Sequence, residues 1–361
     1  MRVPLRGGAA SPPCDTQPVH RSHRPAARPG HRARGAALLA AMLTVTLVAT
    51  FAASAMWQQW RAVEVETAER GRVQSAWILV GALDWSRLIL REDGRSGGAD
   101  HLAEPWAVPL QEARLSTFLA ATNNVSQVDD ASTDTTEAFL SGQISDMQAR
   151  LNITNLIAGE QVDPVALRQF TRLFERLGLP EQQLSLLVDA MRRAQPGSTN
   201  TNSTSATNNQ GNTAPLMPPT VSQLGWLGLT PATIATLAPH VTLLPVRTPV
   251  NLNTAGIDVL MSAVDDLDTA SAQKIVQSRE SSHFKTLSDA QKLVGESVTL
   301  DSSHFSVASG YFEVRGRLRL GDTMLDERSL VRKIGMDVTT LWRERGALDR
   351  ETTPTDTSVL R

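Results

Sequence analysis

The chain has 361 residues, of which 41% are hydrophobic and 20% charged, so it is long and apolar enough to bury a core. Seven Arg and one acidic residue lie in the first 35 positions, which leaves 28 of the 35 basic and 36 of the 37 acidic residues, a net charge of −8, for the remainder. The field of that remainder disfavours binding to phosphate backbones. The single cysteine, Cys14, lies in the basic segment, so the remainder has neither a thiol nucleophile nor a cysteine-ligated zinc site.

An uncharged segment follows the basic one. Residues 36–57, AALLAAMLTVTLVATFAASAMW, carry no formal charge. As a helix they would extend about 33 Å at ~1.5 Å per residue, which is enough to cross a hydrocarbon core. The Arg-rich residues 1–35 are expected to stay in the cytoplasm by the positive-inside rule. We therefore expect a single-pass membrane protein whose body, after Trp57, lies on the far side of the membrane.

Three kinds of N-terminal segment fit this pattern. A signal anchor would keep residues 1–35 attached, and a secretory signal peptide would be cleaved after the small residues Ala53-Ser54-Ala55. A prepilin leader would be cleaved between Gly35 and Ala36, directly before the apolar run. The third is favoured because helical periodicity continues through residues 58–93, with apolar residues at spacings of three and four: Val73, Ala76, Trp77, Val80 and Leu83.

Strands are predicted on both sides of a helical block. Residues 94–153 begin as an irregular segment with Pro105 and Pro109 and end in two strands from about Gly142 to Ile153, joined near residues 146–148. Residues 301–335 contain the clearest alternation, a strand from Phe312 to Leu320 and a partner from Met324 to Val331, with Gly316 on the apolar side. Residues 336–361 are interpreted as a polar tail.

The helical block, residues 154–300, is predicted to be an inserted all-α domain. Polar residues that can cap a helix mark the predicted helix starts: Asp163, Thr230, Thr254, and either Thr269 or Asp268. Residues 196–220 are a low-complexity polar tract, which indicates a flexible insert. Strands on either side of an inserted domain can share one sheet. The predicted fold class is α+β, a long N-terminal helix plus an antiparallel sheet with a large inserted all-α domain.

The chain resembles the minor pseudopilin K of the type II secretion system, also called general secretion pathway protein K. The resemblance extends from about Arg34 to Lys333 and rests on the order of RGAALLAAMLTVTLVA, RLNITNLI, QFTRLFERLGL, PVNLNTAGIDVL and FEVRGRLRLGD followed by ERSLVRK. It implies a pilin-like head in the periplasm, an anchor in the inner membrane, and a position at the tip of the pseudopilus. The implied role is to initiate pseudopilus assembly and to support export of folded proteins across the outer membrane.

The resemblance also implies partners and site residues. The partners are the I and J minor pseudopilins, the major pseudopilin, prepilin peptidase and secreted substrates, and the implied modification after cleavage is N-methylation of Ala36. Most pilin-like proteins carry Glu at the fifth mature position, where it pairs with the N-terminal amine of a neighbouring subunit. Here that residue is Ala40. The K subunit typically lacks this Glu, as expected of a subunit with no neighbour above it.

No cofactor is assigned from the sequence, although calcium is considered. Members of the family bind calcium and form a disulfide in the helical domain, and a mature chain without cysteine excludes the disulfide. Asp265, Asp266 and Asp268 are the oxygen ligands that the sequence offers for calcium. A solvated turn between helices, with one aspartate as an N-cap, is the favoured interpretation of these three residues.

Two alternative functions are also compatible with parts of the sequence. Residues 249–295 also resemble the helix-hairpin-helix modules of DNA-binding proteins, which membrane-anchored DNA receptors of the competence type carry. Such modules bind phosphate through a glycine-opened turn, whereas residues 264–268, VDDLD, have no glycine and three carboxylates, each costing roughly 1 kcal/mol against a phosphate. A periplasmic hydrolase is also disfavoured, because His283 and His304 lie near serines without any catalytic or metal-binding motif. We therefore expect no nucleic-acid binding and no enzymatic activity.

Overall fold

The computed structural model describes residues 34–117, 138–194, 215–294, 299–321 and 323–346. The chain divides into two compact parts between Thr67 and Ala68, and each part is described by itself. Apart from its last two positions, the predicted leader lies outside the described residues. Most of the predicted flexible insert and the last fifteen residues of the predicted tail, 347–361, also lie outside them.

The longest element is the helix α1, Arg34–Ser96, which has 63 residues. Within the first part, every side chain from Ala36 to Thr67 is exposed, including Leu43, Phe51 and Trp57. This section of α1 is long and apolar enough to cross a membrane. A helix that is apolar on all sides and uncovered by protein suits a lipid environment, which indicates a single-pass anchor.

In the second part, α1 is amphipathic and packs against a sheet. Leu79, Leu83 and Leu90 are buried at spacings of four and seven, so they lie on one helix face. The helix ends three residues beyond the predicted Asp93. Gly97 and Gly98 stop it, because their φ angles of 64° and 117° are readily adopted only by glycine.

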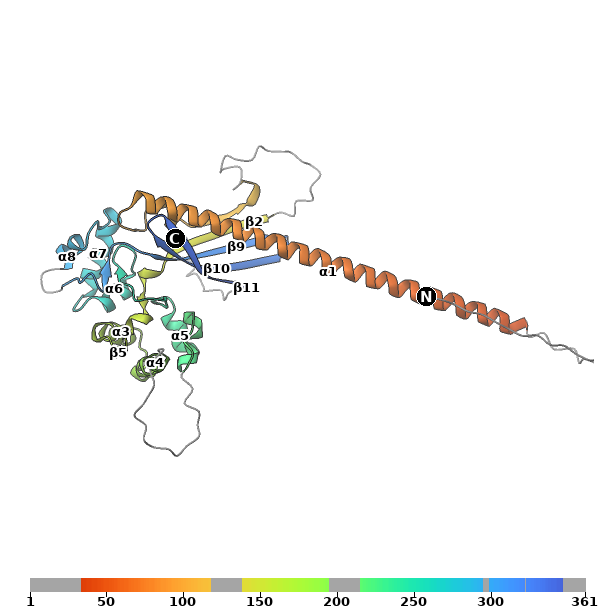
Figure 1. Cartoon of the computed structure of the whole chain (residues 1–361), viewed down its shortest axis with the longest axis horizontal. Coiled ribbons are helices and arrows are strands. Elements are labelled where there is room, and N and C mark those ends of the chain that lie inside the picture. Colours follow the sequence, from red (N-terminus) through yellow and green to blue (C-terminus); the bar gives the residue numbers. More distant parts are fainter. Residues whose placement is uncertain (1–33, 118–137, 195–214, 295–298, 322, 347–361) are drawn as a thin grey trace, which may run out of the picture. The chain divides into compact units, whose positions relative to one another are not determined.

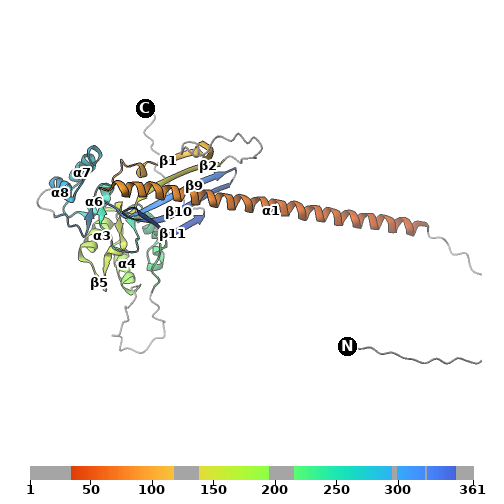
Figure 2. The ribbon, with the colours of Figure 1, turned by 45° about the horizontal axis from the view of Figure 1, so that its top comes forward.

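The buried face of α1 covers a five-stranded antiparallel sheet with the order β1-β2-β9-β10-β11 (Figures 1 and 2). Strands β2 and β9 are neighbours although the helical block separates them in the chain. Both views show helices α3–α8 gathered at one end of the sheet. The strands are β1 Leu110–Arg114, β2 Ala138–Asp146, β9 Tyr311–Leu320, β10 Thr323–Ile334 and β11 Asp337–Gly346.

The predicted pair of strands within residues 142–153 is wrong. Residues 138–146 form the single strand β2, which pairs with β1 and β9. The Asp146 side chain then accepts a hydrogen bond of 2.7 Å from the Gln148 backbone N–H and begins the 3₁₀ helix η2, Met147–Ala149. The expected second strand shrinks to β3, Leu151–Asn152, which pairs with β6 of the helical block.

The predicted pair of strands near the C-terminus is confirmed. The sheet also has an edge strand at each side that the sequence does not predict, β1 and β11. β9 and β10 pair without interruption from Leu320↔Thr323 to Tyr311↔Arg332. The segment predicted as a polar tail instead begins with the strand β11. Gly335 turns the chain at a φ of 56°, and the residues after it favour a strand because they are β-branched or aromatic: Val338, Thr339, Thr340 and Trp342. At the other edge, β1 begins directly after Pro109, so both prolines precede the strand and neither interrupts it.

The block between β2 and β9 folds around its own core, which includes Leu151, Phe170, Leu187, Leu260 and Phe305. Three pairs of two-residue strands accompany its helices: parallel β3 with β6 (Val241–Thr242), antiparallel β4 (Ile157–Ala158) with β5 (Gln161–Val162), and parallel β7 (Val250–Asn251) with β8 (Phe305–Ser306). The helices are α3 Pro164–Arg176, α4 Glu181–Ala194, α5 Pro231–Leu237, α6 Ile257–Ala263, α7 Thr269–Ser281, α8 Leu287–Val294, and the 3₁₀ helices η3 Ile153–Leu156 and η4 Val221–Leu227.

Three of the four predicted helix caps are confirmed. Asp163 accepts backbone hydrogen bonds at the start of α3, Thr230 at the start of α5, and Asp268 at the start of α7. Thr254 is not a cap, because α6 begins after Gly256. The Thr254 hydroxyl instead donates a 2.6 Å hydrogen bond to the Asp146 carboxylate, which lies in the head.

Candidate functional site

The expected processing site lies at the start of α1. Gly35 and Ala36 belong to the first turn of the helix, and Ala40 lies one turn later with its methyl group exposed. No carboxylate occurs between Ala36 and Trp57 to pair with an N-terminal amine. The structure thus gives these residues the helical position that the sequence predicts for them, without testing whether cleavage occurs.

A strip of exposed residues follows the face of α1 that the sheet leaves uncovered. Val73, Trp77, Gly81, Asp84 and Leu88 are all exposed at spacings of four, four, three and four, so they share one helix face. Trp77 is 70% exposed and Leu88 55%. Apart from Asp84 the strip is uncharged, and with a glycine at its centre it suits close packing of another helix. We refer to these five residues as the α1 strip.

Charged residues gather where α1 ends and the inserted block begins. Asp93, Asp100 and Glu104 each offer an oxygen, and these oxygens lie within 4.8 Å of one another. Lys333 of β10 reaches the same place: its Nζ lies 2.5 Å from Asp93 Oδ2 and forms a second ion pair with Asp100. Oxygens this close could share a cation, and the lysine ammonium supplies that charge from within the chain. We call these four residues the junction cluster.

Burial shifts the protonation of the junction cluster. Burial raises the pKa of Asp100 to about 6, although the ammonium of Lys333 opposes the shift. Burial also raises the pKa of Glu104 to about 7, against the hydrogen bonds that its carboxylate accepts from the His101 backbone and from the Trp106 indole. Burial alone would lower the pKa of Lys333, but its hydrogen bonds to Asp100 and Asp93 outweigh that effect and raise the pKa.

A second network ties the head to the inserted block through Asp146. This fully buried carboxylate accepts hydrogen bonds from Thr254 (2.6 Å), Ser309 (2.6 Å) and Asn251 (3.1 Å). The Asn251 amide also donates to the Asp100 backbone carbonyl at 3.1 Å, which links the network to the junction cluster. Burial raises the pKa of Asp146, and these hydrogen bonds partly counteract the shift.

Buried asparagines organise the motifs RLNITNLI and PVNLNTAGIDVL. The Asn152 and Asn155 side chains bond to the backbone of residues 244–248, and Asn253 bonds to both the N–H and the carbonyl of Phe284. Sequence reasoning missed these roles. The repeated asparagines within these apolar runs could have indicated these roles, because a buried side-chain amide needs hydrogen-bond partners.

The histidines and serines of the hydrolase alternative are not arranged as in a catalytic site. His283 stacks on His101 with 3.8 Å between ring centroids, so it fills the junction between the head and the block. The Ser281 and Ser303 hydroxyls donate to Gln277 and Asp301 within their own turns. Neither hydroxyl is bonded to a histidine, as activation of a serine nucleophile would require.

The three calcium candidates also have separate roles. Asp265 forms an ion pair with Arg172, and Asp268 caps α7 by accepting a 2.7 Å hydrogen bond from the Ser271 N–H. Asp266 adopts a left-handed φ of 54° in the intervening turn. Among the described residues, the carboxylates that converge on one point are those of the junction cluster, not these three.

These features define a class of protein. An apolar N-terminal helix that could cross a membrane continues into the helix that packs on the sheet of an α+β head, and a helical domain is inserted between two neighbouring strands. This is a pilin-like α+β fold with an inserted helical block, and its apolar helix suggests a single-pass anchor.

Comparison with known proteins shows which family the chain is similar to. The model of type II secretion system protein K matches residues 149–246 in one section and 250–308 in a second. Type II secretion system protein K of Pseudomonas aeruginosa is 29% identical over 306 residues, which cover 80% of this chain and 85% of the relative. The fold also resembles a chain of the GspK-GspI-GspJ complex from enterotoxigenic Escherichia coli, with a TM-score of 0.58, 19% identity, and coverage of 78% of this chain and 99% of the other. The chain is thus similar to type II secretion system protein K over most of its length.

Proposed function

We propose that this minor pseudopilin sits at the tip of the pseudopilus, initiates its assembly and supports export of folded proteins across the outer membrane. Prepilin peptidase would cleave between Gly35 and Ala36. The mature protein would remain in the inner membrane through residues 36–57, with its body in the periplasm. Its partners would be the I and J minor pseudopilins and the major pseudopilin. The matching fold of a chain in the GspK-GspI-GspJ complex supports this choice of partners.

The observation that carries the proposal is the continuity of α1. One helix runs from the uncharged section into Leu79, Leu83 and Leu90, which are buried against the sheet. A signal peptide removed after Ala53-Ser54-Ala55 would split this helix, whereas cleavage after Gly35 would leave it almost intact. The retained section would anchor the subunit until it is extracted into the pseudopilus.

The tip position rests on Ala40 and on the α1 strip. A subunit within the filament would use a carboxylate at residue 40 to pair with its neighbour's N-terminal amine, and alanine cannot form that pair. The exposed Trp77 and Leu88 offer apolar contact area to the helix of a subunit below. Together they favour a subunit that is bound on one side only.

A role without catalysis accounts for the polar clusters. The groups of both clusters bond within the chain: the junction cluster joins the end of α1 to β10, and the Asp146 network joins the head to the inserted block. Their chemistry is therefore structural. The turn at residues 264–268 carries an Arg172–Asp265 ion pair and no glycine-opened phosphate site, which argues against the DNA-receptor alternative.

Intact-mass measurement of the protein purified from membranes tests the proposal. We expect a mature N-terminus at Ala36, in the membrane fraction, when prepilin peptidase is present. Gly35→Leu should block cleavage, and Ala33→Leu, two residues away, serves as the control. A soluble protein that starts at Met56 would refute the pseudopilin assignment.

A further inference from the structure

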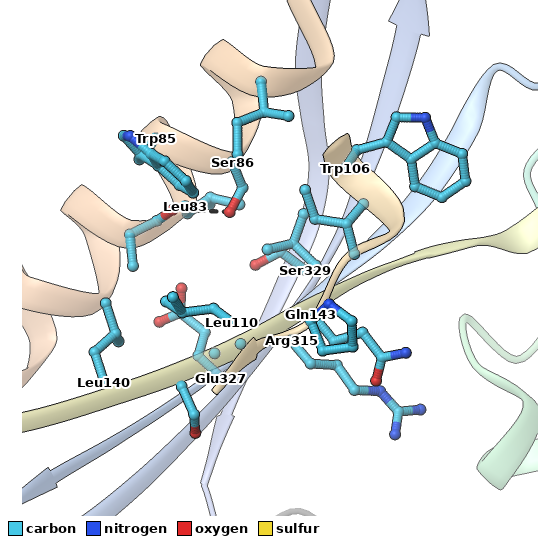
Figure 3. Close-up of a pocket in the computed structure, with 18 of the residues that line it drawn as sticks. Leu83, Trp85, Ser86, Trp106, Leu110, Leu140, Gln143, Arg315, Glu327 and Ser329 are labelled. Atoms are coloured by element: carbon cyan, nitrogen blue, oxygen red, sulfur yellow. Dashed lines mark hydrogen bonds between the residues drawn. The ribbon is translucent and has the colours of Figure 1, made fainter. Parts of the chain in front are cut away.

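We draw no further inference here: the strongest candidate, the apolar groove between α1 and residues 105–110 that Trp85, Ile89 and Trp106 line (Figure 3), carries none, because nothing in the described part of the chain shows what covers it.

Discussion

At the residue scale, the junction cluster sets a pH dependence. Burial raises the pKa of Glu104 from 4.5 to about 7 and that of Asp100 from 3.8 to about 6. A carboxyl group with a raised pKa in the folded state stabilises the fold fully below its unfolded pKa, and this stabilisation is lost as the pH rises through the folded pKa. The fold therefore loses stability as the pH rises from 3.8 to about 6 through Asp100 and from 4.5 to about 7 through Glu104.

Glu104→Gln tests this directly, because glutamine keeps the acceptor for the His101 and Trp106 N–H groups and resembles the protonated acid. We expect the variant to match the parent at pH 4.5 and to exceed its free energy of unfolding by up to about 3 kcal/mol at pH 8. Urea unfolding in detergent micelles across this pH range measures the difference. The exposed Glu92→Gln serves as control, and parallel profiles for the parent and Glu104→Gln would contradict the assignment.

At the element scale, the end of α1 is fixed by close backbone contact. A Cβ on Gly94 would lie 2.0 Å from the carbonyl oxygen of Gly335, in the turn between β10 and β11. Only glycine allows this approach. Lys333 lies in β10 two residues before Gly335, so the contact of Gly94 with Gly335 and the junction cluster hold one end of the helix on the sheet.

Gly94→Ala and Gly71→Ala separate this contact from helix propensity. Alanine is favoured over glycine by about 1 kcal/mol in a helix interior, and Gly71 has no atom within 4 Å of an added Cβ. We expect Gly71→Ala to be neutral or stabilising and Gly94→Ala to destabilise by about 1–3 kcal/mol, as an overpacked site does. Thermal unfolding followed by circular dichroism measures both. Equal effects of the two substitutions on stability would mean that the turn between β10 and β11 shifts to accommodate the added methyl group without a loss of stability.

At the scale of the whole molecule, the proposed assembly depends on the α1 strip. Replacing Trp77 and Leu88 together by alanine should weaken binding to the I and J subunits at least tenfold, because buried tryptophans dominate interface energies. Stability should not change, since both side chains are exposed. Quantitative co-purification from membranes measures the effect, with Leu102→Ala, an equally exposed leucine outside α1, as control. Unchanged recovery of the partner subunits would show that the α1 strip is not part of the interface.

Local patterns identified much of this molecule in advance. The uncharged section of α1, the amphipathic continuation, the caps at Asp163, Thr230 and Asp268, and the hairpin of β9 and β10 all depend on residues close in the chain. Thr254 was mispredicted because its hydroxyl has a distant partner, Asp146. The edge strand β11 was missed because a strand of modest hydrophobicity is recognisable only once β10 pairs with it.

The amino-acid sequence by itself determined the long helix, its apolar section that could cross a membrane, and the α+β class, since periodicity and charge act over a few turns or strands. Tertiary structure alone decided which distant groups meet. It brought Lys333 to Asp93 and Asp100, and it aligned Gly142 with Gly316, where an added Cβ on Gly316 would lie 3.3 Å from Leu79 of α1. Those contacts follow from strand register and from the closure of a long insertion, which no local pattern encodes.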